Sequence, residues 1–272
     1  MQKINFIKMH GLGNDFVIID KRNKNIKITK ELISKLSDRK SGAGCDQLIT
    51  INSNNEKNIE ASIDIFNPTG DKAEACGNGT RCVAKLLFSE FNKSEINIRS
   101  DAGILNAKKI NNENISVNLG KVSTDWKTIP LSHNIDTLNI PIRIDGFENG
   151  IAVNVGNPHV VFFGNDLDLV DLNSLGPKIE NHELFPKKTN VEIVEIINRK
   201  KIRMRVWERG AGITLACGSG ACASAYAGVL KNLLDNYVEV IVTRGSLFIE
   251  IDNNQAIMTG PAEISFHGNI EI

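Results

Sequence analysis

The 272-residue sequence lacks several features that would assign it to a common functional class. Lysine plus arginine and aspartate plus glutamate each number 32, so the formal net charge is zero, and no long run of either sign occurs. We therefore expect neither a nucleic-acid nor a membrane-surface partner. Residues 1–10 lack the uninterrupted apolar segment of a signal peptide, and no stretch approaches a transmembrane span. These absences predict a soluble cytoplasmic protein.

Common cofactor and metal motifs are missing as well. The sequence contains no Walker A loop, no Rossmann G-x-G-x-x-G after an expected strand, and no H-E-x-x-H. It has an odd number of cysteines, whose spacings do not suggest a disulfide framework: Cys45, Cys76, Cys82, Cys217 and Cys222. No C-x-x-C is present, so zinc ligation is not indicated. We therefore expect neither a metal nor a cofactor.

Two cysteines lie where a glycine-rich turn leads into an expected helix. Cys76 stands in Ala-Cys-Gly-Asn-Gly-Thr-Arg-Cys (75–82), and Cys217 stands in Ala-Cys-Gly-Ser-Gly-Ala-Cys (216–222). The first N–H groups of a helix have no partner within it and carry partial positive charge, which stabilises anions. The position therefore predicts a lowered thiol pKa at both cysteines. Cys82 and Cys222 are interpreted as small buried hydrophobic residues.

Short alternating or apolar runs predict strands along most of the chain. These runs are residues 4–9, 16–20, 48–51, 63–66, 96–99, 140–144, 151–155, 160–163, 191–197 and 202–207. A helix is expected over residues 30–38 with Thr29 as its N-cap, and others begin near Cys76 and Cys217. Residues 221–230 offer almost no polar face, which predicts a helix buried on all sides and wrapped by sheet.

The two halves of the sequence repeat each other. Cys217 follows Cys76 by 141 residues, and at the same offset aromatic, alanine and glycine residues coincide: Phe66 with Trp207, Ala75 with Ala216, Gly77 with Gly218, Gly79 with Gly220 and Ala84 with Ala225. A second echo, Gly-Asn before a strand, links residues 13–18 with 156–161 at an offset of 143. This order of matches predicts an internal duplication.

The duplication predicts an α/β fold of the α+β type with two pseudo-symmetric domains. Each domain is expected to be a mostly antiparallel, strand-rich, barrel-like sheet wrapped around a central helix. The polar stretch near residues 120–137 suggests the boundary, giving domains 1–120 and 121–262. Equivalent helix ends could then face each other across a cleft. Two thiols would approach one small-molecule substrate from opposite sides.

Such a pair suits inversion at a stereogenic carbon. One thiolate removes a proton from one face and one thiol delivers a proton to the other. The carboxylate beside the carbanion could be held between the turns Gly77-Asn78 and Gly218-Ser219 by backbone N–H groups.

Five segments together resemble the diaminopimelate epimerase family. They are His10–Phe16 (HGLGNDF), Gly42–Gln47 (GAGCDQ), Ala75–Cys82, Gly156–His159 (GNPH) and Glu208–Cys222. The resemblance implies cofactor-independent interconversion of LL- and meso-2,6-diaminopimelate on the route to lysine and peptidoglycan precursors. It also implies that residues 263–272 complete the first domain, and it leaves a homodimer open.

The resemblance also implies the site. Cys76 and Cys217 match the acid/base thiols, and His159 and Glu208 match residues that help set their protonation. Substrate-recognition positions correspond to Asn14, Gln47, Asn67, Asn157, Asn190 and Arg209, and the turns that hold the reacting carboxylate correspond to Gly77, Asn78, Gly218 and Ser219. Thr69, Asp71 and Ile213 depart from the family pattern and put the hydrogen bonding of nearby loops in question. Cys45 has no catalytic counterpart and is interpreted as packing.

Alternatives remain at this point. His159 could be a satisfied strand histidine, Glu208 and Arg209 a surface ion pair, and Asn78 a turn residue. At the level of function, the rivals are a proline or hydroxyproline racemase of the same architecture and a non-catalytic redox switch that forms a Cys76–Cys217 disulfide.

Overall fold

The computed structural model describes residues 3–73 and 76–271. Ala75 of the first cysteine motif therefore lies outside the described residues. The chain divides into two compact units, which we call unit 1 (Met1–Val117 and Gly260–Ile272) and unit 2 (Asn118–Thr259). Both divisions fall within strands, so the chain passes between the units twice.

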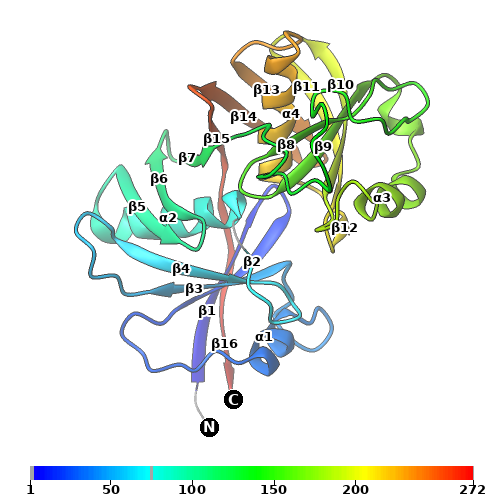
Figure 1. Ribbon diagram of the computed structural model, residues 1–272. Coiled ribbons are helices and arrows are strands. Elements are labelled where there is room, and N and C mark those ends of the chain that lie inside the picture. Colours follow the sequence, from blue (N-terminus) through cyan, green and yellow to red (C-terminus); the bar gives the residue numbers. More distant parts are fainter. Residues whose placement is uncertain (1–2, 74–75, 272) are drawn as a thin grey trace. The chain divides into compact units, whose positions relative to one another are not determined.

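Unit 1 is a sheet with two helices. Its elements in chain order are β1 (Lys3–Gly11), β2 (Asn14–Asp20), α1 (Lys30–Ser37), β3 (Gln47–Asn52), β4 (Ala61–Phe66), α2 (Gly77–Phe91), β5 (Glu95–Ser100), β6 (Gly103–Lys109), β7 (Asn114–Lys121) and, from the end of the chain, β16 (Glu263–Glu271). The strand order is β16-β1-β2-β3-β4-β5-β6-β7. Figure 1 shows β16, in dark red, running beside β1 in blue, in agreement with their antiparallel pairing.

Unit 2 has a sheet of the same kind. Its elements are β8 (Ile151–Asn154), β9 (Pro158–Gly164), the 3-10 helix η1 (Leu167–Leu169), α3 (Leu172–Glu180), β10 (Asn190–Asn198), β11 (Lys201–Glu208), β12 (Gly212–Ile213), α4 (Gly218–Leu230), β13 (Tyr237–Val242), β14 (Gly245–Asp252) and β15 (Gln255–Pro261). The strand order is β15-β14-β13-β11-β10-β9-β8, and β12 pairs with β11.

The two sheets repeat one topology. From β1 to β6 the successive pairings are antiparallel, parallel, antiparallel, parallel and antiparallel. From β8 through β9, β10, β11 and β13 to β14 the same succession occurs. The helices also correspond, because α1 and α3 precede the third strand while α2 and α4 follow the fourth. The predicted duplication and α+β class are confirmed.

The strand register shows which single residues of the two units correspond. In unit 1, Phe16 on β2 lies opposite Gln47 on β3 in a parallel ladder. In unit 2, His159 on β9 lies opposite Asn190 on β10 in the same way. His159 therefore occupies the place of Phe16, and the residues two positions after the partners, Ile49 and Glu192, correspond in turn.

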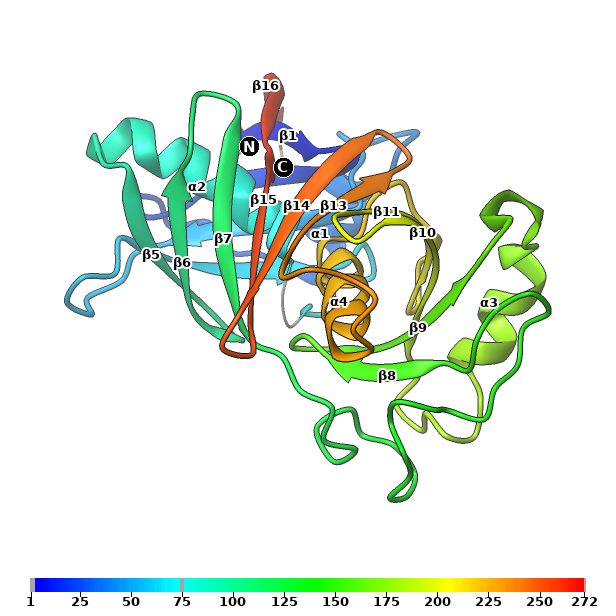
Figure 2. The same ribbon diagram turned by 90° about the horizontal axis from the view of Figure 1, so that it is seen from above.

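Each sheet surrounds one long helix. α2 packs against β1, β2, β5 and β6, and α4 packs against β8, β9, β10, β11, β13 and β14. Figure 2 shows α4 among the strands of unit 2. Residues from Gly220 to Gly228 of α4 are all buried, as the nearly apolar composition predicts, but the prediction is wrong for Leu230 at the end of the helix, which is exposed. No helix of the part that the structure describes is long and apolar enough to cross a membrane.

The helix starts follow from their N-caps. The side chain of Thr29 accepts a hydrogen bond from Leu32 N–H at 3.2 Å, and α1 begins one residue later, as predicted. Leu32, Ile33 and Leu36 then bury one face of α1 against β3, in a core that also contains Leu48. This spacing is the helical period that the sequence shows.

The strand predicted over residues 140–144 is wrong. Ile140 forms only an isolated bridge with Gly150, and the segment continues as turns and irregular backbone. Its apolar alternation is real, since Ile140, Ile142 and Ile144 are all buried in the core of unit 2. Pro141 lacks an N–H group and cannot donate to a ladder. The alternation therefore reports burial rather than sheet pairing.

Candidate active site

Cys76 and Cys217 are the N-caps of α2 and α4. Gly79 N–H donates to Cys76 Sγ at 3.4 Å, and Gly220 N–H donates to Cys217 Sγ at 3.3 Å. Each sulfur therefore takes one of the N–H groups that a helix leaves without an internal partner. The two cysteines occupy the same local structure in the two units.

The second glycine of each Cys-Gly-x-Gly turn lies directly against a side chain of the sheet. A Cβ at Gly79 would lie 2.5 Å from Ile49 Cδ1, and a Cβ at Gly220 would lie 2.8 Å from Glu192 Oε1. Real Cβ atoms essentially never make contacts this short, so the side chain of Ile49 or Glu192 would have to shift. The missing side chain lets the first helical turn approach the sheet closely and brings the N–H groups to the sulfur atoms.

In unit 1 the structure brings Asn14 and Asn78 to Cys76. The thiol faces Asn14 Oδ1 at 3.9 Å, and Asn78 Nδ2 donates to the same oxygen at 3.1 Å. Gly77 and the largely buried Asn78 form the first helical positions of α2. Gln47 and Asn67 meet each other, with Gln47 Nε2 donating to Asn67 Oδ1 at 3.1 Å.

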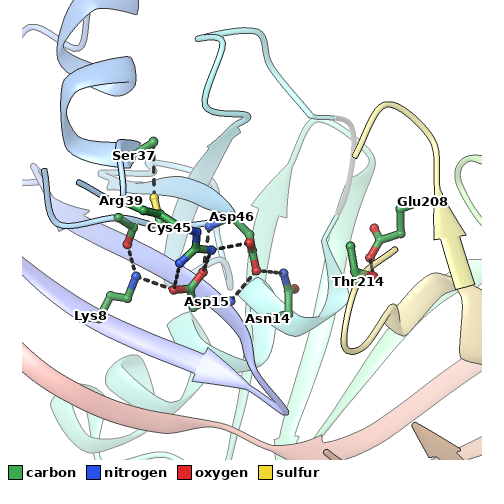
Figure 3. A network of polar contacts seen from close by, with 10 residues as sticks. Lys8, Asn14, Asp15, Ser37, Arg39, Cys45, Asp46, Glu208 and Thr214 are labelled. Carbon is green, nitrogen blue, oxygen red and sulfur yellow. Dashed lines mark hydrogen bonds and ion pairs between the residues drawn. The ribbon is translucent and has the colours of Figure 1, made fainter. Parts of the chain in front are cut away.

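A network of charged residues orients Asn14 (Figure 3). Asn14 Nδ2 donates to Asp46 Oδ2 at 2.9 Å, and Asp15 N–H donates to the same oxygen at 3.0 Å. Because a carboxylate only accepts hydrogen bonds, the amide nitrogen of Asn14 must face Asp46. The amide oxygen is thereby turned towards the thiol of Cys76.

The carboxylates of this network are neutralised by two cations. Lys8 Nζ lies 2.6 Å from Asp15 Oδ2, and Arg39 Nη2 contacts Asp15 at 2.8 Å and Asp46 at 2.6 Å. Burial raises the pKa of Asp15, but the hydrogen bonds from Arg39 and Lys8 outweigh it and lower that pKa to about 2. Two positive and two negative groups therefore make a compact network, in which Arg39 and Asp46 are partly exposed.

In unit 2 the thiol of Cys217 is buried among polar groups. Ser219 Oγ lies 3.5 Å from Cys217 Sγ, and Gly218 is the first residue of α4. Glu208, at the end of β11, accepts a hydrogen bond from Thr214 Oγ1 (Figure 3). Glu208 is thus held within unit 2 by a neighbouring hydroxyl.

The predicted lowering of the Cys217 pKa is wrong for this environment. Burial raises the pKa of Cys217 well above its ordinary value, and the negative charges of Glu208 and Glu192 raise it further. The hydrogen bonds from Ser219 and Gly220 act in the opposite direction but are outweighed. The helix N-terminus is therefore not the dominant influence on this thiol.

Asn190 and Arg209 are linked through the backbone. Asn190, almost fully buried, donates from Nδ2 to Pro158 O at 2.8 Å and accepts from Arg209 N–H at 2.9 Å. Asn190 therefore fixes the main chain on which Arg209 stands. The Arg209 side chain donates to Lys187 O at 3.4 Å.

His159 is completely buried between two oxygen atoms. Its Nδ1 lies 2.7 Å from Glu192 Oε1, and its Nε2 lies 2.8 Å from Asn157 Oδ1. The side chain is therefore a hydrogen-bonded strand histidine that is also joined to a buried acid. Glu192 shares this complete burial.

Sequence reasoning missed Asp15, Asp46 and Glu192, which hold the predicted residues Asn14 and His159. One signal could have found Glu192, because a charged residue stands there within a run of apolar residues where the first half of the sequence has Ile49. Asp15 and Asp46 stand directly beside Asn14 and Gln47. Their shared partner Arg39 stands seven residues before Asp46, but no local pattern in the sequence pairs it with either acid.

The remaining cysteines pack in the interior. Cys82 and Cys222 are fully buried, and burial raises the pKa of Cys82 to about 12. Burial also raises the pKa of Cys45, whose thiol donates to Ser37 Oγ at 3.4 Å (Figure 3). Such thiols are protonated at neutral pH and act as small hydrophobic residues.

Sequence comparison finds a matching family profile and relatives that align over nearly the whole chain. A profile of the family described as diaminopimelate epimerase matches residues 6–124 and 151–265. A diaminopimelate epimerase of Pelagibacter ubique (strain HTCC1062) is 46% identical over 275 residues, covering 99% of both chains. One from Rhodospirillum centenum is 39% identical over 266 residues, covering 97% of this chain and 91% of the relative.

Solved structures of distant sequence share the fold. A hydroxyproline epimerase from Agrobacterium vitis gives a TM-score of 0.73 at 12% identity and covers 98% of this chain and 92% of its own. A phenazine biosynthesis protein of the PhzF family from Bacillus anthracis gives a TM-score of 0.67 at 17% identity, with both chains covered completely. At such low identity these similarities concern the fold alone.

Proposed function

Since the chain belongs to the diaminopimelate epimerase family, and is therefore an isomerase, we propose that it interconverts LL- and meso-2,6-diaminopimelate. The observation that carries this proposal is the pair of N-capping thiols, Cys76 and Cys217, in equivalent places of a duplicated fold. The reaction would serve the formation of lysine and peptidoglycan precursors in the cytoplasm.

The proposed chemistry is proton exchange at one α-carbon without a cofactor. A thiolate removes the α-hydrogen as a proton, and the electron pair of the broken C–H bond moves towards the adjacent carboxylate. The opposed thiol then gives its proton to the other face of the carbon, so a new C–H bond forms with inverted configuration. One thiolate and one thiol remain, with their roles exchanged.

The environment of Cys217 supports its role as the initial acid. Burial and the nearby charges of Glu208 and Glu192 disfavour its thiolate, so Cys217 holds its proton at neutral pH. Cys76, which is only partly buried and faces Asn14 and Asn78, is then the initial base. Catalysis in the reverse direction would begin from the opposite protonation states.

Binding of the substrate follows from the residue types at the predicted positions. The reacting carboxylate would lie at the helix starts Gly77-Asn78 and Gly218-Ser219, where backbone N–H groups and partial positive charge stabilise an anion. Arg209 could hold the distal carboxylate through a bidentate contact. Polar contacts to the two amino-acid ends would come from Asn14, Gln47, Asn67, Asn157 and Asn190.

Solvent exchange tests the proposal directly. The reduced protein is incubated with LL-diaminopimelate in deuterated water, and product configuration and α-deuterium are followed by NMR. We expect epimerisation with deuterium uptake, and the loss of epimerisation in both Cys76→Ala and Cys217→Ala. An unchanged epimerisation rate in either variant would contradict the two-thiol mechanism.

Matched controls separate the rival functions. Cys222→Ala removes a buried thiol five residues from Cys217 on the same helix and should leave the epimerisation rate close to that of the wild type. Proline and hydroxyproline are assayed in parallel, and activity on them without activity on diaminopimelate would replace the proposed substrate. A redox switch predicts no turnover of any amino acid by the reduced protein.

A further inference from the structure

We propose that Glu192 is a positioning residue that holds a proton on Nδ1 of His159 and thereby sets the polar surroundings of Cys217. The effect on turnover rests on the proposed function, whereas the effect on His159 does not. Glu192 itself touches no reacting atom in this proposal.

Glu192 and His159 form a hydrogen bond in the interior of unit 2. Glu192 Oε1 lies 2.7 Å from His159 Nδ1, and both side chains are completely buried. Glu192 Oε2 is also buried and has no hydrogen-bond partner among the described residues. A buried carboxylate is costly to desolvate, and the hydrogen bond with His159 offsets part of that cost. The interaction with His159 is therefore the main compensation that the structure gives this charge.

The partners of the two ring nitrogens of His159 decide where the ring carries a proton. An ionised carboxylate is only an acceptor, so the hydrogen bond to Glu192 requires a proton on His159 Nδ1. The other nitrogen, Nε2, faces Asn157 Oδ1 at 2.8 Å. The oxygen of Asn157, a predicted substrate-recognition residue, is also only an acceptor. Nε2 therefore either donates to it, so that the ring carries both protons, or accepts from the Asn157 amide nitrogen after a 180° turn of that amide, and Nδ1 holds a proton in both cases. A carboxylate that selects the ring orientation in this way is a recurring device in catalytic sites.

Unit 1 has apolar residues at the positions that correspond to His159 and Glu192. Phe16 and Ile49 occupy in unit 1 the places of His159 and Glu192 in unit 2, because the ladders pair Phe16 with Gln47 and His159 with Asn190. The contacts with the cysteine helix agree with this correspondence. A Cβ at Gly79 would meet Ile49 Cδ1 at 2.5 Å, and a Cβ at Gly220 would meet Glu192 Oε1 at 2.8 Å.

The two units fill the same place in the fold with different kinds of side chain. In unit 1 an apolar pair fills the space beneath the first turn of the cysteine helix, so the fold does not demand charge at this place. Unit 2 buries a carboxylate and an imidazole there instead, next to the turn that carries Cys217. A costly polar pair in a position that apolar residues can fill indicates a functional role.

The test is Glu192→Gln, followed by 15N NMR of the histidine side chains in the ligand-free protein at pH 7.5. In the wild type we expect the Nδ1 resonance of His159 to be that of a protonated nitrogen. The variant loses the negative charge that favours a proton on Nδ1, and the amide can either accept from or donate to this nitrogen, so the resonance should move towards that of an unprotonated ring nitrogen. We also expect kcat for diaminopimelate to fall at least about tenfold. An unchanged Nδ1 resonance would overturn the proposal.

Two further variants control for folding. Glu195→Gln lies on the same strand and loses an ion pair with Arg203, and it should change neither the His159 resonance nor kcat. The double variant His159→Phe/Glu192→Ile installs the apolar pair of unit 1, and we expect it to fold but to lose turnover. Full turnover in the folded double variant would overturn the proposal, as would failure of both Glu192 variants to fold, since the pair would then be structural.

The NMR readout keeps this inference separate from the proposed function. If the wild-type protein does not act on diaminopimelate, the proposed function fails, yet the His159 resonances still decide whether Glu192 holds the proton. If the wild type is active and the resonances of Glu192→Gln are unchanged, only the role of Glu192 fails.

Discussion

Lys8 shows how a buried charge is made tolerable in unit 1. Its ammonium group contacts Asp15 at 2.6 Å and also donates to Gly44 O, while the side chain is almost fully buried. Removing one member of such a pair leaves an uncompensated charge in the interior, which costs more than the pair itself contributes. The stability of this part of the sheet should therefore depend on Asp15.

We expect Asp15→Asn to lower the free energy of unfolding of unit 1 by about 2 to 3 kcal/mol at pH 7. The pKa of Asp15 in the folded protein is about 2, below its ordinary value of 3.8. A depressed folded-state pKa contributes stability above the unfolded-state pKa, and this contribution is lost as pH falls from about 4 to 2. Urea unfolding of both proteins across this range measures the difference.

The control for this prediction is Asp71→Asn, which removes an exposed ion pair with Lys30 in the same unit. It should unfold like the wild type because exposed pairs contribute little. The free energy of unfolding of Asp15→Asn should approach that of the wild type as the pH falls to about 2. A difference that stayed constant down to about pH 2 would show that the ion pairs of Asp15 are not its cause.

Single residues also show where sequence reasoning ends. Cys76 and Cys217 could be found because a helix start, a glycine-rich turn and a repeat all appear in the linear pattern. The orientation of Asn14 by Asp46 could not, because it depends on which side-chain atoms meet after folding. The raised pKa of Cys217 likewise depends on burial and on the two nearby carboxylates, Glu208 and Glu192, one of which was not expected there.

Helices were predictable from the sequence where the spacing of apolar residues and the capping residue indicate the same start. α1 begins after Thr29 and α2 and α4 begin after their cysteines because the capping side chains define these positions. The alternating segment 140–144 was wrongly predicted as a strand. Alternation shows which residues are buried, whereas a strand also needs backbone N–H donors and a neighbouring strand to pair with. The identical order of parallel and antiparallel pairings in both units became visible only in the structure.

The start of α4 gives an element-scale prediction. Alanine at Gly220 places a methyl group 2.8 Å from Glu192 Oε1 and 3.3 Å from Cys217 Sγ, so the carboxylate, the sulfur or the helix must move. We expect Gly220→Ala to lower the free energy of unfolding by about 1 to 3 kcal/mol despite the higher helix propensity of alanine. Thermal unfolding and the 15N resonances of His159 measure the two consequences.

Gly79→Ala is the matched comparison in unit 1. Its new methyl group meets the end of the flexible Ile49 side chain, so it should affect stability without moving the His159 resonances. A Gly220→Ala protein with unchanged melting temperature and unchanged His159 resonances would show that the turn has more room than the distances indicate.

At the scale of the whole molecule, unit 1 combines both ends of the described chain. β16 pairs with β1 from Lys3–Glu271 to His10–Glu263, and Phe6 packs edge-on against Phe266 with ring centroids 6.2 Å apart. The duplication in the sequence does not contain this strand, because β16 has no counterpart in unit 2. Its expected return to the first domain came from family resemblance rather than from any local pattern.

A truncation measures what β16 contributes. We expect a chain that ends at Ala262 to lose protection from hydrogen exchange in β1, since the N–H and C=O groups that β16 pairs would be exposed along that edge. Protection in β10 and β11, which lie in unit 2, should remain as in the full chain. Hydrogen exchange followed by mass spectrometry reports both regions in one experiment, and intact protection of β1 would contradict the expectation.

The pairing of β1 with β16 also constrains the order of events on the ribosome. Unit 2 is one continuous segment and is complete when residue 259 has left the exit tunnel, whereas one edge of β1 must wait for β16, which is made after unit 2. Domains usually fold in the order of their synthesis. Here the half that is translated first acquires its final strand only after the other half is available to fold.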